Sequence, residues 1–159
     1  MTPSQPTPPT DPQAIAEHVR RGMLANDRAS RGLGMDVTAI GPGRATVTMT
    51  VREDMLNGFD ICHGGFISTL ADSAFAFACN SYDELTVASG FSVDIVAPAR
   101  LGDQLTAVAV ERSLTGRLGV YDVTVTRGDG STIALFRGRS YRMKGCLLYT
   151  SDAADEEDS

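Results

Sequence analysis

The hydrophobic and polar positions of the chain follow two different periods. Apolar residues recur at helical spacing between residues 12 and 27, and the segment from Gly65 to Cys79 is apolar on nearly every side. A helix that is apolar all round is a buried one, so we expect the second helix to lie inside the domain. Elsewhere apolar and polar residues alternate as they do in strands, with turn signals between the runs. The expected strands cover residues 34–40, 44–51, 87–96, 104–112, 120–127 and 132–142.

Consecutive strands joined by short loops predict an antiparallel meander, and the apolar helix is inserted after the second strand. A sheet can bury such a helix by curling around it. The sequence therefore predicts an α+β fold, in which an antiparallel sheet of about six strands is wrapped around a central buried helix.

The two ends of the chain lack this periodicity. Residues 1–12 contain five prolines and predict a disordered leader, whereas residues 13–145 carry the domain. Residues 146–159 read as a non-native tail, because the stretch from Cys146 to Glu156 matches a one-frame translation of a widely used sequencing adapter. A natural acidic tail is the alternative. Without the five carboxylates of this tail, the formal net charge of -6 becomes about -1.

Composition and spacing argue against several classes of protein. No run of apolar residues is long enough to predict a membrane span, and the proline-rich start lacks the features of a secretory signal, so we expect a cytoplasmic protein. The three cysteines and two histidines show no metal-binding spacing, and we expect neither a metal nor another cofactor. Nucleic acid is not an expected partner, because phosphate binding requires clustered Lys and Arg.

Three stretches carry a recognisable pattern: LNGFDICHGGFISTLADSAFAFACNS at residues 56–81, GVYDVTV at 119–125 and ALFRGRSYR at 134–142. Over roughly residues 13–145 the chain resembles the phenylacetate-degradation thioesterase (PaaI) family of hotdog-fold acyl-CoA thioesterases. The resemblance implies hydrolysis of acyl-CoA thioesters without a metal, with phenylacetyl-CoA and its ring-hydroxylated relatives as the type substrates. It also implies a catalytic aspartate at Asp72, a helix-start amide at Gly64, and supporting polar groups at His63 and Asn57.

The residues themselves support this chemistry. Thioester hydrolysis develops negative charge on the carbonyl oxygen, and the first amides of a helix are donors at the positive end of its dipole. A tight turn into the helix is the alternative reason for Gly64 and Gly65. Asp72 lies within an otherwise apolar helix, where a carboxylate is costly unless it is hydrogen-bonded or functional. Its role as a general base or as a nucleophile stays open.

Further residues are expected to contact the substrate. Gly65, Phe66 and Phe75 are candidates for contact with the acyl group, and Phe66 stands where many hotdog thioesterases carry Gln or Asn. Arg137 and Arg139 are candidates for binding the CoA phosphates through charge-assisted hydrogen bonds. Outward-facing arginines that favour solubility fit the same pattern nearly as well.

The loop before the helix carries two more polar side chains. For His63 we favour a structural role, in which it and Asn57 hold the loop and orient the acyl group or water. A nucleophile formed by Cys62 and His63 is disfavoured, because adjacent side chains tend to point apart and cysteine is commonly a small buried apolar group.

Helix geometry predicts the quaternary arrangement. Gly64 and Asp72 lie eight residues apart, which is about 12 Å along one helix axis. One thioester carbon cannot touch both, so we expect the site between two subunits of a homodimer or homotetramer that binds acyl-CoA. The alternatives are a hotdog hydratase or dehydratase, and a non-catalytic acyl-CoA-binding protein.

Overall fold

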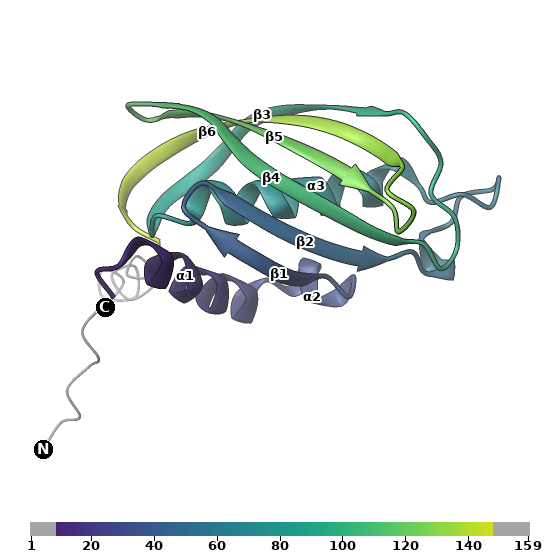
Figure 1. Ribbon diagram of the computed structural model, residues 1–159, viewed down its shortest axis with the longest axis horizontal. Coiled ribbons are helices and arrows are strands. Elements are labelled where there is room, and N and C mark those ends of the chain that lie inside the picture. The colour runs from purple at the N-terminus through teal and green to yellow at the C-terminus, as the bar shows by residue number, and fades with distance from the viewer. Residues whose placement is uncertain (1–8, 148–159) are drawn as a thin grey trace, which may run out of the picture.

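The computed structural model describes residues 9–147 as one antiparallel sheet with helices packed against it (Figure 1). Most of the predicted leader and most of the predicted tail lie outside the described residues. The elements are α1 (Pro12–Asn26), α2 (Arg28–Gly32), β1 (Asp36–Gly41), β2 (Arg44–Thr50), η1 (Glu53–Met55), α3 (Gly64–Asn80), β3 (Glu84–Ile95), β4 (Gln104–Thr115), β5 (Leu118–Thr126) and β6 (Thr132–Cys146).

The predicted strands and both predicted helices are present, but the order of the strands is not that of a simple meander. The six strands pair in the order β1-β2-β4-β5-β6-β3, and every pair is antiparallel. The meander prediction is therefore right for β4, β5 and β6 and wrong for β3. The helix α3 follows β2, and the next strand, β3, lies at the far edge beside β6, so that β4 pairs with β2.

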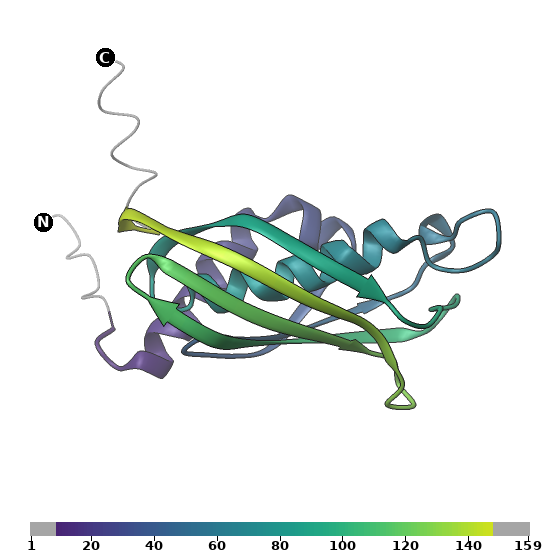
Figure 2. The same cartoon turned by 90° about the horizontal axis from the view of Figure 1, so that it is seen from above.

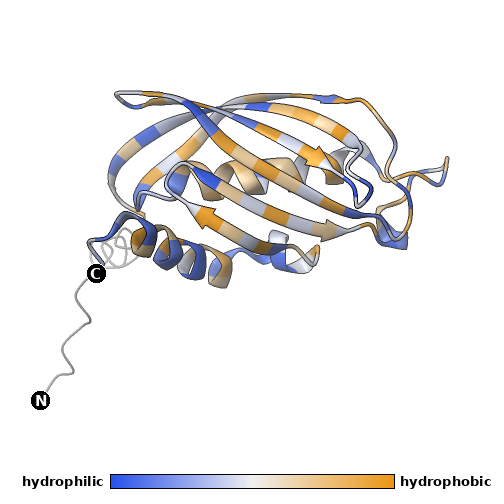
Figure 3. Cartoon of the chain, viewed as in Figure 1, coloured by the Kyte–Doolittle hydropathy of each residue, from blue (hydrophilic) through white to orange (hydrophobic). Residues whose placement is uncertain are grey.

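The concave side of the sheet holds α3, which Figure 2 shows running along the strands. Its apolar side chains join those of the strands in one core, and the ring of Phe75 lies 5.6 Å from that of Tyr121 and 5.9 Å from that of Phe136. The alternation of apolar and polar residues that predicted the strands is visible along them in Figure 3. The α+β hotdog architecture, a curled sheet around a central helix, is confirmed.

The burial of α3 is less complete than its composition predicts. Nine of its residues are buried, from Ile67 to Asn80. One stripe that includes Gly65, Thr69, Asp72 and Ala76 is exposed or half-buried, with the spacing of a single helix face. The small size of most of these side chains made the helix appear apolar all round. The described chain thus leaves one face of its central helix incompletely covered, and Asp72 lies on that face.

The sheet is open and has two edges of different character. The edge strand β1 has six residues, whereas β3 at the other edge has 12. Large apolar side chains on β3 are exposed: Val87 by 43%, Phe91 by 44% and Ile95 by 46%. A long edge with unpaired backbone groups and apolar side chains is a surface on which a second strand can pair.

Candidate active site

The candidate site begins where α3 begins. His63 is the N-cap residue, with an extended backbone, and its carbonyl oxygen accepts a hydrogen bond from the amide of Phe66 at 3.0 Å. The amides of Gly64 and Gly65 are the first two of α3 and have no acceptor within the helix. Within residues 9–147 they also donate to no other backbone or side-chain oxygen. The first turn of α3 therefore offers two free donors at the positive end of the helix dipole.

The two glycines are not required by a turn. Neither has a positive φ, so the backbone conformation alone does not explain them. A Cβ on Gly64 would lie 2.7 Å from Cδ1 of Ile95, which means that the end of β3 approaches the helix start closely. At Gly65 the nearest atom to such a Cβ is Nδ1 of His63 at 3.8 Å, so this position is open. The absence of a side chain at Gly65 lets a ligand approach the backbone closely.

Asn57 anchors the loop that leads into the helix. Its Oδ1 accepts hydrogen bonds from the amides of Phe59 at 2.9 Å and Ile61 at 3.4 Å, and its own amide donates to the carbonyl oxygen of Ile61 at 2.9 Å. This loop projects from one end of the molecule in Figures 1 and 2. The side-chain nitrogen of Asn57 donates to no group of the described chain, so it is available to a ligand.

His63 and Cys62 do not form a catalytic pair in this structure. The imidazole of His63 is exposed and makes no hydrogen bond within residues 9–147, while its backbone amide donates to Met55 at 2.8 Å. Cys62 is 4% exposed, burial raises the pKa of its thiol, and its Sγ lies 3.7 Å from the carbonyl oxygen of His63. A raised pKa disfavours the reactive thiolate. The loop is thus held by Asn57 and by backbone bonds rather than by the imidazole.

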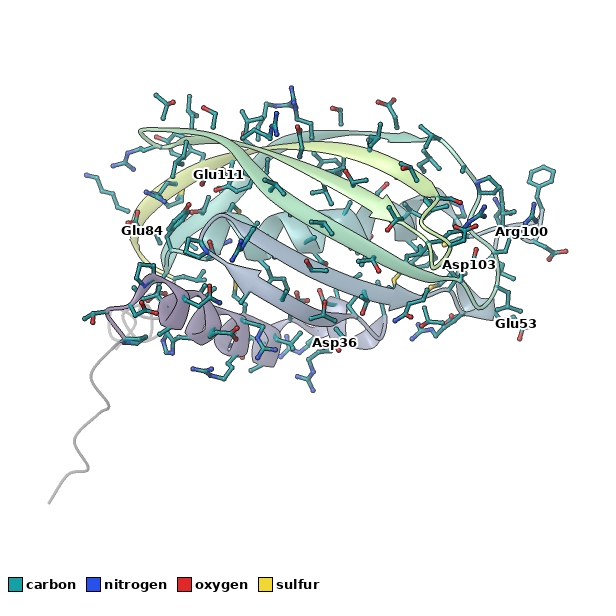
Figure 4. All side chains as sticks on the ribbon, viewed as in Figure 1. Asp36, Glu53, Glu84, Arg100, Asp103 and Glu111 are labelled. Atoms are coloured by element: carbon teal, nitrogen blue, oxygen red, sulfur yellow. The ribbon has the colours of Figure 1, made fainter. Side chains whose placement is uncertain are left out.

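A cavity of about 490 Å³ opens beside the helix start. Its walls come from the loop before α3, the first turns of α3, and the end of β3 with the segment that follows: Asn57, Ile61, Cys62, Gly64, Ile67, Ile95, Val96, Ala97 and Pro98. Asp103 closes the neighbouring turn by accepting a hydrogen bond from the amide of Arg100 at 2.8 Å, and Figure 4 shows both residues at this end of the molecule. The cavity is mostly apolar, and Asn57 is the polar residue among those that line it.

Asp72 lies two turns further along α3 and has a different environment. Burial raises the pKa of its carboxyl, and the negative charge of Asp27 adds to this rise. Asp27 belongs to the junction between α1 and α2, and its Oδ2 accepts a hydrogen bond of 2.6 Å from Ser30 Oγ. Ser30 Oγ lies 3.0 Å from the hydroxyl of Ser73, the residue next to Asp72. The α1–α2 junction is therefore fastened to α3 beside the candidate catalytic carboxylate.

The structure keeps the two parts of the candidate site apart. Gly64 and Asp72 both lie on α3, and eight residues of helix correspond to about 12 Å. A reacting carbon must come within about 3 Å of both the oxyanion donor and the nucleophile or water held by the base. A single α3 cannot satisfy both demands for one substrate.

The remaining candidates are distributed between the core and the outer face. Phe66 is half-buried in the first turn of α3 and packs against the core. Phe75 is 1% exposed and contacts the rings of the core, so the structure gives it a packing role and does not bring it to the cavity. Arg137 and Arg139 are exposed on the sheet face opposite α3. Arg137 donates to both oxygens of Asp122, at 2.6 and 2.9 Å, and is already engaged.

Comparison with known proteins identifies the family. A model of the Thioesterase superfamily matches residues 59–134. The acyl-coenzyme A thioesterase PaaI of Escherichia coli K12 is 45% identical over 125 residues, which cover 79% of this chain and 89% of that protein. This chain belongs to the PaaI family of hotdog acyl-CoA thioesterases.

Solved structures agree with this assignment. The E. coli PaaI protein from the phenylacetic acid degradation operon superposes with a TM-score of 0.84 at 42% identity, covering 86% of this chain and 99% of that one. A Streptococcus mutans UA159 protein bound to acetyl CoA has a TM-score of 0.66 at 26% identity, covering 69% and 88%. The PaaI-family chain described here is an acyl-CoA thioesterase, and the hydratase and non-catalytic alternatives are not favoured.

The hydrogen-bonded group of Asp27, Ser30 and Ser73 beside Asp72 is not predictable from the sequence alone. The sequence contains a signal for Asp27 alone, because Asp is a preferred N-cap residue. That signal predicts the start of α2 but not its proximity to Asp72. Within residues 9–147, no cluster of His, Cys, Asp and Glu side chains has a metal-binding arrangement, and no helix combines the length and apolar character needed to cross a membrane.

Proposed function

We propose that this PaaI-family thioesterase hydrolyses aryl-acyl-CoA thioesters of the phenylacetyl or hydroxyphenylacetyl type to the free acid and CoA. We propose further that each active site combines the start of α3 from one subunit with Asp72 from a second copy. The observation that carries this proposal is the placement of an unpartnered Gly64 amide and a half-buried Asp72 about 12 Å apart on one helix.

Two copies of α3 packed antiparallel across a twofold axis would remove this conflict. Their half-buried faces, which include Gly65, Thr69, Asp72 and Ala76, have small side chains that permit close approach of two helices. The exposed edge strand β3 gives the same pair of chains a second surface, since twofold pairing of two β3 edges would extend the sheet. The assembly would then be a homodimer, or a homotetramer made of two such dimers.

The residues support a simple sequence of bond changes. Asp72 accepts a proton from water, the water oxygen attacks the thioester carbon, and the oxyanion is stabilised by the amides of Gly64 and Gly65. When the C–S bond breaks, the proton on Asp72 passes to the CoA thiolate. A direct attack by Asp72, with an anhydride that water then hydrolyses, fits the same geometry. In both routes the reactive form of Asp72 is the ionised one.

The cavity beside the helix start supports an aryl substituent. Its volume of about 490 Å³ lies within the usual range of small-molecule sites, and its walls are mostly apolar. Asn57 is one of its lining residues, and a side-chain nitrogen without a partner in the described chain is suited to orienting the acyl oxygen or a ring hydroxyl. The origin of the E. coli PaaI relative in the phenylacetic acid degradation operon points to the same class of acid.

A kinetic experiment tests both parts of the proposal. Purified protein is assayed for thiol release with phenylacetyl-CoA, hydroxyphenylacetyl-CoA and straight-chain acyl-CoAs of similar size. We expect the highest kcat/KM for the aryl substrates, and a loss of kcat of at least about 100-fold in Asp72→Ala, the scale of removing a general base. Higher kcat/KM for straight chains would refute the substrate class. An Asp72→Ala variant that keeps more than a tenth of wild-type kcat would refute the role of Asp72.

A further inference from the structure

A second carboxylate, that of Asp27, is linked through Ser30 to Ser73, the residue next to Asp72. Asp27 is the N-cap residue of α2, and its Oδ1 accepts a hydrogen bond of 2.9 Å from the amide of Ser30. Its Oδ2 accepts a second one, of 2.6 Å, from Ser30 Oγ. Both oxygens are thus fixed by one residue, and this fixes the orientation of the carboxylate.

The same residue fastens this carboxylate to α3. Ser30 is 2% exposed, although it belongs to a short surface helix, and its hydroxyl lies 3.0 Å from that of Ser73. Ser30 Oγ donates its one proton to Asp27, so in the contact between the two serines Ser73 Oγ is the donor and Ser30 Oγ the acceptor. We call the hydrogen-bonded group of Asp27, Ser30 and Ser73 the Asp27 network. It joins the α1–α2 junction to the residue that follows Asp72.

Other charged and titratable groups also lie around α3. From the sheet, Glu111 lies at the C-terminal end of the helix, where its Oε1 accepts hydrogen bonds from Tyr82 at 3.0 Å and Tyr121 at 2.9 Å. Figure 4 shows Glu111 and Glu84 together at that end of the molecule. Arg142 of β6 lies over the ring of Tyr82. On α3 itself, Cys79 follows Asp72 by about two turns; burial raises the pKa of its thiol to about 12, and the negative charge of Asp72 adds to this rise.

We propose that Asp27 is a positioning residue for the thioesterase reaction: the Asp27 network, which reaches Ser73 through Ser30, holds a second negative charge beside the segment of α3 that carries Asp72 and thereby favours a proton on Asp72. The inference rests on the proposed role of Asp72 as base or nucleophile. Two carboxylates that share a partly buried site disfavour the ionisation of one another. In agreement with this geometry, the charge of Asp27 acts after burial to raise the pKa of Asp72.

The arrangement has a use in catalysis. A carboxylate with a low pKa is a weak base, and a general base is most effective when its pKa approaches the working pH. Burial and a neighbouring negative charge both move the pKa of Asp72 in that direction. Asp27 therefore increases the basicity of Asp72 without touching the substrate.

The test is the pH profile of Asp27→Asn. Asparagine is as good an N-cap as aspartate and keeps an acceptor for the Ser30 amide, so α2 and the fold are expected to persist. Loss of the negative charge lowers the pKa of Asp72. Because the ionised form of Asp72 is the active one, the acid limb of kcat/KM is expected to move to lower pH. A variant that only loosened the structure would lower kcat/KM without moving this limb.

Asp11→Asn is the matched control. Asp11 caps α1 in the same way, accepting from the amide of Ala14 at 3.0 Å, and its replacement removes the same charge. It lies at the other end of the 15-residue helix α1, about 22 Å away along the axis. We expect its pH profile to match that of the wild type. An equal displacement in both variants would show a general effect of net charge and overturn the proposal.

A direct measurement separates this inference from the proposed function. The carboxyl carbon of Asp72 can be titrated by NMR in the wild-type protein, Asp27→Asn and Asp11→Asn, with the signal assigned by its loss in Asp72→Asn. We expect a lower midpoint in Asp27→Asn alone. An unchanged midpoint overturns the inference even when Asp72→Ala is inactive. Conversely, an active Asp72→Ala overturns the proposed function, while the titration still tests the coupling of the two carboxylates.

Discussion

Two inactive variants should complement each other if the active site lies between subunits. Gly64→Pro removes the first amide donor of α3 and leaves Asp72 intact, whereas Asp72→Ala removes the carboxylate and leaves the donor intact. Proline is tolerated at the first position of a helix, and Gly64 occupies that position. Each parent alone is expected to lose at least about 100-fold in kcat. In a mixed dimer, one of the two sites would combine the intact donor with the intact carboxylate.

The expected recovery follows from the statistics of association. Equal amounts of the two chains form mixed dimers in about half of all cases, and each mixed dimer has one working site of two, so about a quarter of wild-type activity should return. Two affinity tags allow the mixed dimers to be isolated, and these should show about half of wild-type activity. Circular dichroism and size-exclusion chromatography of each parent establish that both fold and associate.

A steric control is required because proline also adds atoms at position 64. A Cβ there would lie 2.7 Å from Cδ1 of Ile95, a flexible side-chain end. Gly64→Ala adds this Cβ but keeps the amide, so it should retain more activity than Gly64→Pro. Isolated mixed dimers that are folded but no more active than their parents would show that Gly64 and Asp72 serve the same subunit. Our reasoning from the 12 Å helical separation would then be wrong.

Two further predictions concern the sheet. Gly138→Ala should lower the free energy of unfolding by about 1–3 kcal/mol, because a Cβ there would lie 2.8–2.9 Å from ring atoms of Phe75 within a packed core. A midpoint of urea unfolding equal to that of the wild type would contradict this prediction. Asp122→Asn should cost only a few tenths of a kcal/mol near pH 7, because the pair with Arg137 is exposed to solvent. The hydrogen bond from Arg137 lowers the pKa of Asp122. The stabilisation from the pair is therefore present above about pH 4 and is lost as the pH falls through the pKa of Asp122 in the folded state. A difference in unfolding free energy between variant and wild type that grows in acid would refute this prediction.

The sequence by itself determined the elements and the chemistry of α3. Alternation of apolar and polar residues fixes which side chains of a strand can face a core, and this is a local property of the chain. The start of α3 at Gly64 and the anomalous carboxylate at Asp72 are local as well. A single Asp within a long apolar helix indicates a cost that must be offset, whatever the fold around it.

Tertiary structure decided which elements became neighbours. Local patterns do not specify strand partners, and the position of β3 beside β6 follows from the path of α3 across the sheet. Register across β5 and β6 brings Arg137 directly opposite Asp122, which engages an arginine that the sequence left available for CoA phosphates.

Packing likewise decided the surroundings of the two parts of the site. Phe75 and Phe66 look equivalent in the sequence, but only the position of α3 against the strands assigns Phe75 to the core. The contact between Ser30 and Ser73 spans 43 positions of the chain and depends on the docking of the α1–α2 junction onto α3. Charge interactions depend on distance in space rather than along the chain, and for that reason only the folded structure could show that two carboxylates share one environment.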